Sequence, residues 1–301
     1  MQWFQIREQA AGRNRLKISW WLYKVFGKNA LYLIAFFVAF FTFVFAGNVR
    51  AYSRKYFTVI EPYTGLKPNL LNQFRHICSY ALGLVDKMLV YSGNFNINDV
   101  VFENEDDRKM FFDDIEKQKG VFFICNHIGN IEVLQGFALS SNPEYKINIF
   151  LSRRQSQIFN EFIDEIKQYL PVRIFPIEEI GVDTVIELKD NLDKGDIVFI
   201  AGDRLAENND SKCVEQTLFA RKIFLPVGTF KLAKLMEVPT YFITALKCGG
   251  KYKVYLEKQY NLSENELIAS YTKYLEKMIL VNPFQFFHFF DFFARERLAP
   301  G

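Results

Sequence analysis

His127 is the residue whose type and position best suit proton transfer. The 301-residue chain contains only two other histidines, His76 and His288. An imidazole has an ordinary pKa near neutral pH, so it can accept a proton as a general base. His127 directly follows the apolar run Val121–Cys125, which is typical of a buried strand. Because open α/β sheets place their sites at the carboxyl ends of strands, we take His127 as the candidate base.

Glu132 follows His127 by five positions. On an ideal helix five residues turn by about 500°, which leaves the two side chains about 140° apart. They can meet if His127 lies in the turn before a helix and Glu132 lies in its first turn. Asn126, a candidate helix cap, and Gly129 favour such a turn. The carboxylate would then hold one imidazole nitrogen and leave the other as the base. The alternative is a structural histidine beside an ordinary first-turn glutamate.

Positively charged side chains follow two other predicted strands. Arg153 and Arg154 follow one strand, and Asp203 and Arg204 follow another. If these strands run parallel to the one before His127, their carboxyl ends share one edge of the sheet, and we expect the arginines to bind anionic groups of a substrate. The alternative is that they are surface arginines, or that Arg204 pairs with an acid and braces its loop.

The elements that position these residues form an α/β pattern from Gly120 onward, in which short apolar runs alternate with helical stretches. We therefore predict a central, mostly parallel sheet flanked by helices. The predicted strands are Val121–Cys125, Ile147–Leu151, Val172–Phe175, Ile197–Ala201, Thr240–Leu246 and Tyr252–Leu256. The predicted helices are Leu70–Tyr91, Asp106–Lys117 and residues 130–140, 155–169, 183–194, 228–237 and 264–280. No linker divides residues 57–301, which we treat as one domain.

Residues 1–56 have the composition of a basic, amphipathic and hydrophobic membrane anchor. Residues 1–55 carry nine Lys and Arg against one acid, and residues 30–46 read ALYLIAFFVAFFTFVFA. As a helix this run would be about 26 Å long, slightly shorter than a hydrocarbon core of about 30 Å. Three interpretations remain: a short membrane span, a hydrophobic hairpin within one leaflet, or a buried helix of the core. An apolar segment with basic flanks favours an anionic membrane surface as a partner.

Composition excludes several other classes of protein. A formal net charge of +3 is too small to indicate nucleic acid as a partner. The four cysteines show no C-x-x-C spacing, so neither a metal site nor a disulfide framework is predicted. No Gly-rich dinucleotide loop, P-loop or G-x-S-x-G motif occurs, and no cofactor is expected.

The segment from Asn126 to Glu132 resembles the H-x-x-x-x-[DE] motif of the lysophospholipid acyltransferase superfamily. The similarity is strongest to the bacterial branch that contains the late, lauroyl-type acyltransferases of lipid A biosynthesis, and it covers most of the chain. It includes the apolar N-terminal segment, residues 195–204, residues 219–228 and the stretch Asn282-Pro-Phe-Gln-Phe-Phe. The N-terminal sequence is nearer to a subgroup that is often found with specialised lipid or polyene pathways.

The resemblance implies transfer of a fatty acyl group from a thioester of acyl carrier protein or coenzyme A to a hydroxyl or amine of a lipid or glycolipid. It implies a His127 base paired with Glu132, substrate contacts around Asn126 and Gly129, and backbone N–H groups near Gly129 as donors to the oxyanion. The implied location is the cytoplasmic face of a bacterial inner membrane. Two rivals remain, namely a thioester or lipid hydrolase of the same fold and a non-catalytic lipid-binding membrane protein.

Overall fold

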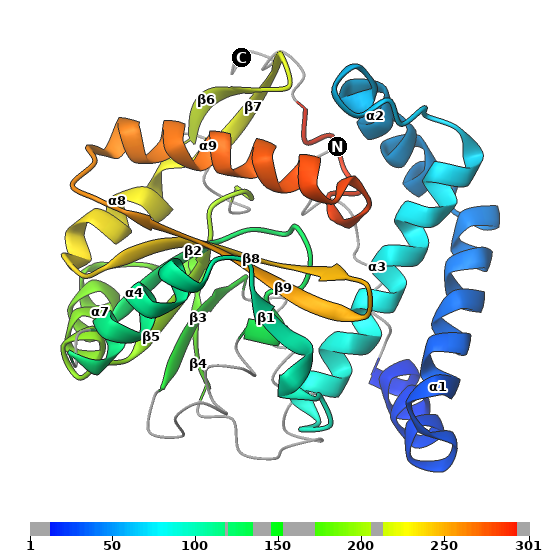
Figure 1. The fold of residues 1–301 in the computed structure, drawn as a ribbon, viewed down its shortest axis with the longest axis horizontal. Helices are drawn as coiled ribbons and strands as arrows, with labels where there is room; N and C mark the ends of the chain where they lie inside the picture. The colour runs from blue at the N-terminus through cyan, green and yellow to red at the C-terminus, as the bar shows by residue number, and fades with distance from the viewer. Residues whose placement is uncertain (1–12, 118–119, 135–145, 153–171, 206–212, 294–301) are drawn as a thin grey trace.

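A seven-stranded sheet forms the centre of the molecule (Figure 1). The computed structural model describes residues 13–117, 120–134, 146–152, 172–205 and 213–293. The strand order is β1-β9-β8-β2-β5-β3-β4, and only the β8–β9 pair is antiparallel. The strands are β1 (Val100–Phe102), β2 (Val121–Cys125), β3 (Ile147–Leu151), β4 (Val172–Pro176), β5 (Ile197–Ala201), β8 (Thr240–Cys248) and β9 (Lys251–Gln259). The predicted mostly parallel sheet is confirmed.

The strands that sequence patterning missed are short or polar. β1 has only three residues, too few to show a periodicity. A separate two-stranded sheet pairs β6 (Cys213–Leu218) with β7 (Arg221–Pro226). The turn of this hairpin places Phe219 and Ala220 at positive φ, where glycine or asparagine is the usual signal. The sequence pattern therefore did not predict this hairpin, because its exposed face is polar and its turn lacks the usual glycine or asparagine.

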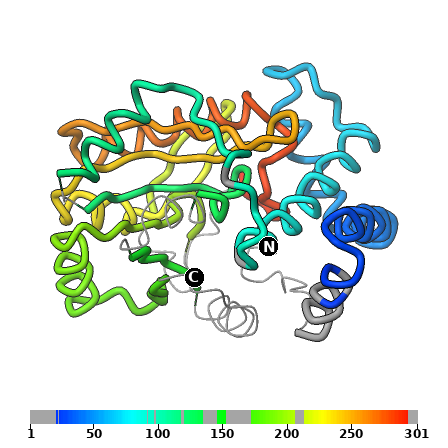
Figure 2. Tube along the Cα trace, turned by 60° about the horizontal axis from the view of Figure 1, so that its bottom comes forward, coloured from blue at the N-terminus to red at the C-terminus, as the bar shows by residue number. Residues whose placement is uncertain are grey.

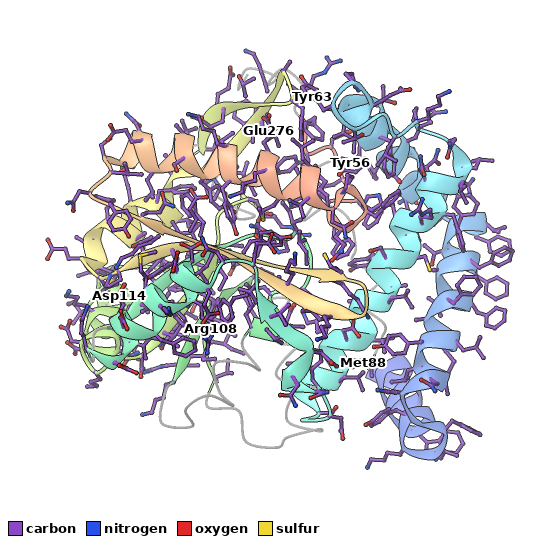
Figure 3. The ribbon with its side chains drawn as sticks, in the orientation of Figure 1. Tyr56, Tyr63, Met88, Arg108, Asp114 and Glu276 are labelled. Carbon is purple, nitrogen blue, oxygen red and sulfur yellow. The ribbon has the colours of Figure 1, made fainter. Side chains whose placement is uncertain are left out.

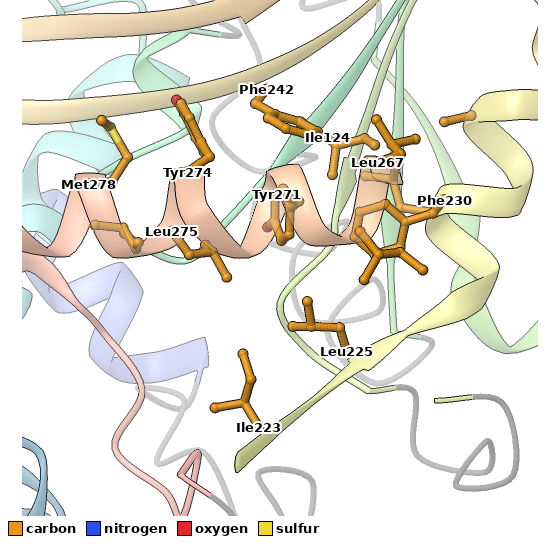
Figure 4. Close-up of a cluster of buried hydrophobic side chains, with 14 of the residues drawn as sticks. Ile124, Ile223, Leu225, Phe230, Phe242, Leu267, Tyr271, Tyr274, Leu275 and Met278 are labelled. Atoms are coloured by element: carbon orange, nitrogen blue, oxygen red, sulfur yellow. The ribbon is translucent and has the colours of Figure 1, made fainter. Parts of the chain in front are cut away.

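Helices cover both faces of the sheet, and β2 is buried on each side. Phe122 and Ile124 belong to the core formed with α7 (Val182–Asp193), α8 (Val227–Met236) and α9 (Glu264–Val281), part of which Figure 4 shows. Phe123 belongs to the core on the opposite face, together with α4 (Glu105–Glu116). Alternate residues of one strand thus enter two cores, which explains its apolar run without polar interruption.

Most predicted helices are present close to their expected bounds. The helix expected at Leu70–Tyr91 is α3, with these same ends, and α9 begins at the expected residue 264, after a capping box of Ser263 and Glu266. Of the helix predicted at 130–140, residues 130–134 are described, and residues 132–134 of these are helical. The helix predicted at 155–169 lies outside the described residues, as do Arg153 and Arg154.

Three helices form a layer at one side of the sheet. α1 (Arg13–Phe45) is kinked at Gly27 (φ 72°, ψ −176°), and α2 (Gly47–Thr64) and α3 (Leu70–Tyr91) follow it. α1 and α3 lie side by side in both views (Figures 1 and 2). The domain boundary expected after residue 56 falls inside α2, and Tyr56 and Phe57 of this helix are buried in the main core. α2 is therefore packed as part of the body.

Candidate active site

The parallel pairing of β2 with β5 brings His127 beside Asp203. Cys125 and Ala201 are register partners at the carboxyl ends of these strands, and each candidate residue follows two positions later. The imidazole Nδ1 lies 2.8 Å from Asp203 Oδ1, and the main-chain N–H of His127 donates to Asp203 Oδ2 at 2.7 Å. The sequence-based expectation that the residues after β5 lie beside His127 is therefore met.

Asp203, and not Glu132, is the carboxylate that holds the imidazole. The Glu132 carboxylate forms an ion pair with Lys87 of α3. Burial raises the pKa of Glu132, but the charge of Lys87 and its hydrogen bond outweigh burial and lower that pKa, and the charge of His127 contributes in the same direction. The hydrogen bond expected between Glu132 and His127 is thus replaced by one from Asp203, and Glu132 acts on His127 through its charge.

Asn126 and Gly129 shape the turn that carries His127. Gly129 has φ +73°, and a Cβ at this position would lie 2.0 Å from the carbonyl oxygen of Ala245, so only glycine fits. The Asn126 amide is buried, donates to Thr244 Oγ1 at 2.7 Å and accepts from the N–H of Ile128 at 3.1 Å. The structure gives both residues contacts within the protein, whereas the sequence suggested contacts with substrate.

The main-chain N–H groups at this turn also have protein acceptors. The N–H of Gly129 donates to the carbonyl of Gln285 at 2.8 Å, and that of Asn130 donates to the carbonyl of Ala245 at 2.9 Å. These two hydrogen bonds join the turn to β8 and to the segment after α9. The groups expected near Gly129 as oxyanion donors are therefore engaged in holding the turn in place.

Asp203 is an ionised acceptor in this arrangement. Its side chain is buried. Burial would raise the pKa of its carboxyl, but His127 and His288, through charge and through hydrogen bonds, hold that pKa well below its ordinary value. Since an ionised carboxylate can only accept, Nδ1 of His127 is the donor and Nε2 carries the free lone pair. Nε2 has no hydrogen-bond partner among the described residues, and the side chain is 32% exposed.

A second histidine reaches the same carboxylate from the Phe-rich C-terminal segment. His288 Nε2 lies 2.9 Å from Asp203 Oδ2, and the imidazole is buried. Arg204 donates from Nε to His288 Nδ1 at 3.4 Å and from Nη2 to the carbonyl of Phe287 at 3.1 Å. From the sequence, His288 has no assigned role and Arg204 is expected to bind anions. Arg204 and His288 are far apart in the sequence, and no periodic pattern of residues indicates that they meet in the fold.

The three groups at the centre of the site include ligand types that bind divalent metals. Ligand atoms of His127, Asp203 and His288 lie within 4.8 Å of one another. The two imidazoles, however, direct N–H groups at the Asp203 oxygens, so these atoms are paired with one another instead of converging on a common point. We therefore treat the cluster as a hydrogen-bonded chain.

No protein-family model matches the chain, and a comparison with curated proteins finds no significant match. The functional conclusion therefore rests on the residues of the site.

Exchanging Glu132 for glutamine tests its contribution by charge. The amide removes the negative charge that favours an imidazolium at His127 and breaks the ion pair with Lys87. We expect kcat to fall about tenfold, less than for a change at Asp203, because Glu132 makes no hydrogen bond to the imidazole. Steady-state kinetics of Glu132→Gln and Asp203→Asn measure this order. If kcat fell further in Glu132→Gln than in Asp203→Asn, Glu132 and not Asp203 would be the main carboxylate that supports the base.

Proposed function

We propose that the protein is an acyltransferase that moves a fatty acyl group from a thioester to a hydroxyl or amine of a lipid, with His127 as the general base. The observation that carries this proposal is the partly exposed Nε2 of an imidazole whose other nitrogen is bound to the buried Asp203 carboxylate. This pairing is the base–orienter half of a Ser-His-Asp site. The resemblance of residues 126–132 to the acyltransferase motif supports the same reaction.

The site contains a base without an enzyme nucleophile, within the described residues. Neither a hydroxyl nor a thiol contacts His127 Nε2 there, and the nearby Cys125 thiol is buried in β2, which raises its pKa. The proton that Nε2 accepts would therefore come from a bound acceptor. This favours direct transfer over a covalent acyl-enzyme.

The reaction then follows from the tautomer of His127. Nε2 takes the proton of the acceptor hydroxyl or amine as its oxygen or nitrogen attacks the thioester carbonyl carbon. Asp203 stabilises the resulting imidazolium through the Nδ1 hydrogen bond. The tetrahedral intermediate collapses, the carbon–sulfur bond breaks, and the imidazolium returns its proton to the leaving thiolate. The products are the acylated lipid and the free thiol of the carrier.

The donor class follows from this chemistry, because acyl carrier protein and coenzyme A both present acyl thioesters. We place the reaction on the cytoplasmic face of a bacterial inner membrane, where both carriers occur. The four free cysteines fit a reducing compartment.

Lipid mass spectrometry of cells with and without the gene tests the proposal. We expect one lipid class to lose an acyl chain when the gene is deleted and to regain it with wild-type but not His127→Ala protein. Unchanged lipids would contradict the proposal.

The N-terminal helix supports a membrane location. The segment Tyr23–Phe45 of α1 is long and apolar enough to cross a membrane, by length and composition. Figure 3 shows a row of aromatic rings along α1 that points away from the rest of the molecule. Exposed residues recur at every fourth position along one face: Leu33, Phe37, Phe41 and Phe45. An apolar face of this kind, with basic residues near it, fits an anionic lipid surface.

The opposite face of α1 is packed along α3. Leu31 and Ala35 are buried against Val85 and Leu89, and further along the helix pair Phe74 contacts Phe36 at 5.7 Å between ring centroids. The two helices therefore run antiparallel in close contact. If α1 enters a bilayer, the part of α3 that packs against it must enter to a similar depth.

α3 is in turn bound to the site. His76 Nε2 lies 2.7 Å from the carbonyl oxygen of Phe286, and Lys87 pairs with Glu132. If α1 crossed the bilayer, the charged groups of Arg75, Asp86 and Lys87 would enter with α3, at about 2.5–3.5 kcal/mol each on insertion scales. We therefore propose that α1 lies in the plane of one leaflet, with its Phe-rich face in the lipid.

Tryptophan quenching by brominated lipids separates the two orientations. Single tryptophans replace Leu33, Phe37, Phe41 or Phe45 in a protein whose three native tryptophans are changed to phenylalanine. The first and last positions are about 18 Å apart along the helix axis. An in-plane helix predicts one similar depth for all four probes. A progressive change of depth from Leu33 to Phe45 would show a spanning helix and contradict the in-plane orientation.

A further inference from the structure

We propose that Arg204 and His288 are positioning residues that keep the Asp203 carboxylate available as an acceptor for His127, and so keep the base nitrogen Nε2 free of a proton. This inference rests on the proposed role of His127 as the base. It concerns two residues that touch neither the reacting atoms nor a substrate in the proposed reaction. Arg204, His288, Asp203 and His127 form one chain of hydrogen bonds.

The directions of the hydrogen bonds in this chain follow from two of its members, the Arg204 guanidinium and the ionised Asp203 carboxylate. A guanidinium has only donors, so His288 Nδ1, which lies 3.4 Å from Arg204 Nε, must be the acceptor. A neutral imidazole has one N–H, which must then be on Nε2, 2.9 Å from Asp203 Oδ2. The second oxygen of Asp203 remains for the N–H at Nδ1 of His127. Arg204 thereby fixes the tautomer of His288, whose N–H orients the carboxylate that accepts from His127.

The surroundings of His288 keep it neutral. Its imidazole is fully buried and stacks on Phe292 at 4.6 Å between ring centroids. Burial is the largest cause that lowers the pKa of His288 to about 3; Arg204 and His127 lower it further, and Asp203 opposes them. These three are the charged or titratable groups that act on it, and the neighbouring Asp291 is paired with Lys55. His288 therefore stays uncharged between pH 5 and pH 9.

A neutral His288 donates a hydrogen bond to Asp203 without offsetting the negative charge of that carboxylate. A protonated imidazole beside Asp203 would offset the carboxylate charge that stabilises an imidazolium at His127. An apolar residue would remove one of the two N–H donors to Oδ2 of Asp203 and leave only the main-chain N–H of His127 to hold that oxygen. The buried, neutral donor orients Asp203 and leaves the carboxylate charge to act on His127.

Nuclear magnetic resonance of the full-length protein labelled with ¹⁵N-histidine tests the hydrogen-bond chain without any activity assay. The chain has three histidines, so each signal is assigned from a single substitution. At pH 8 we expect His288 to be protonated at Nε2 only and His127 at Nδ1 only. His288 should keep this state down to pH 5. A proton on Nδ1 of His288 would overturn the proposal, whether or not the protein transfers acyl groups.

Substitutions at the two positions link this chain to the base. In Arg204→Met, His288 Nδ1 loses its donor and a nearby positive charge, so the pKa of His288 should rise and its single tautomer should become a mixture. The matched control is Arg108→Met, which removes a surface ion pair with Glu105 on α4 and should leave the histidine signals unchanged. Identical histidine spectra of Arg204→Met and wild type would show that Arg204 does not set the tautomer.

At position 288, glutamine and leucine distinguish a donor from a simple filler of space. Glutamine can place an amide N–H near the position of Nε2, whereas leucine cannot donate. We expect His288→Leu to lower kcat at least tenfold with little change in KM, and His288→Gln to keep at least a third of the wild-type kcat. Equal kcat values for two variants of equal melting temperature would contradict the positioning role. If wild-type protein shows no acyl transfer, the proposed function fails, and the spectra still decide this inference.

Discussion

Replacing His127 with alanine is expected to lower kcat for acyl transfer by about 10²–10⁴, the usual contribution of a general base. The imidazole is partly exposed, and its second nitrogen is paired with a buried carboxylate. Without it, the acceptor hydroxyl must lose its proton to water. Steady-state rates measured with saturating thioester and lipid give the comparison.

The fold should tolerate this change, because the His127 side chain is partly exposed and Asp203 retains two other N–H donors. These are the main-chain N–H at position 127 and His288 Nε2. Circular dichroism and thermal unfolding of the variant check this point. Normal turnover by a folded His127→Ala protein would contradict the role of His127 as the general base.

The second large effect is expected for Asp203→Asn, which should lower kcat by about 10²–10⁴. Oδ2 of Asp203 accepts from two N–H groups, so the amide oxygen of the variant should take that place. The amide NH₂ would then face Nδ1 of His127, which must become an acceptor, and the proton of the imidazole would move to Nε2. The base nitrogen would be blocked by its own proton, as in the asparagine variant of a Ser-His-Asp site.

The control for this substitution is Asp291→Asn, which removes an acid from the same region and breaks its pair with the exposed Lys55. Its kcat should stay within about twofold of wild type. The ¹⁵N spectrum of Asp203→Asn should show His127 protonated at Nε2. Normal turnover of Asp203→Asn, with His127 still protonated at Nδ1, would show that Asp203 does not set the tautomer of the base.

Sequence patterning predicted the sheet well where strands are buried on both faces. β2, β3 and β5 have the predicted ends, because continuous apolar runs bounded by polar residues admit few other interpretations. The hairpin of β6 and β7 escaped detection because β6 packs against α9, a long-range contact that no local pattern encodes. The path of α1 along α3 was likewise open, since a long apolar helix fits a bilayer and a partner helix equally well.

The site was predicted in location but not in its pairing. His127 and Asp203 each lie two residues past the end of a strand, and the parallel register of β2 with β5 makes them neighbours. This equal offset was the signal that could have identified Asp203 as the partner of the imidazole. The spacing to Glu132 drew attention instead, whereas Lys87, 45 positions before Glu132, binds that carboxylate. Long-range pairs of this kind leave no trace in spacing.

The central claim, that this site moves an acyl group to a lipid, is tested most directly with purified protein on vesicles. The vesicles contain total membrane lipids of cells that lack the gene, and the donors are isotope-labelled saturated acyl thioesters of coenzyme A and acyl carrier protein. We predict one free thiol for each labelled acyl chain that appears in an ester or amide of a lipid, and neither product with His127→Ala. Release of thiol with labelled free fatty acid alone, or no release above the His127→Ala rate, would contradict the claim.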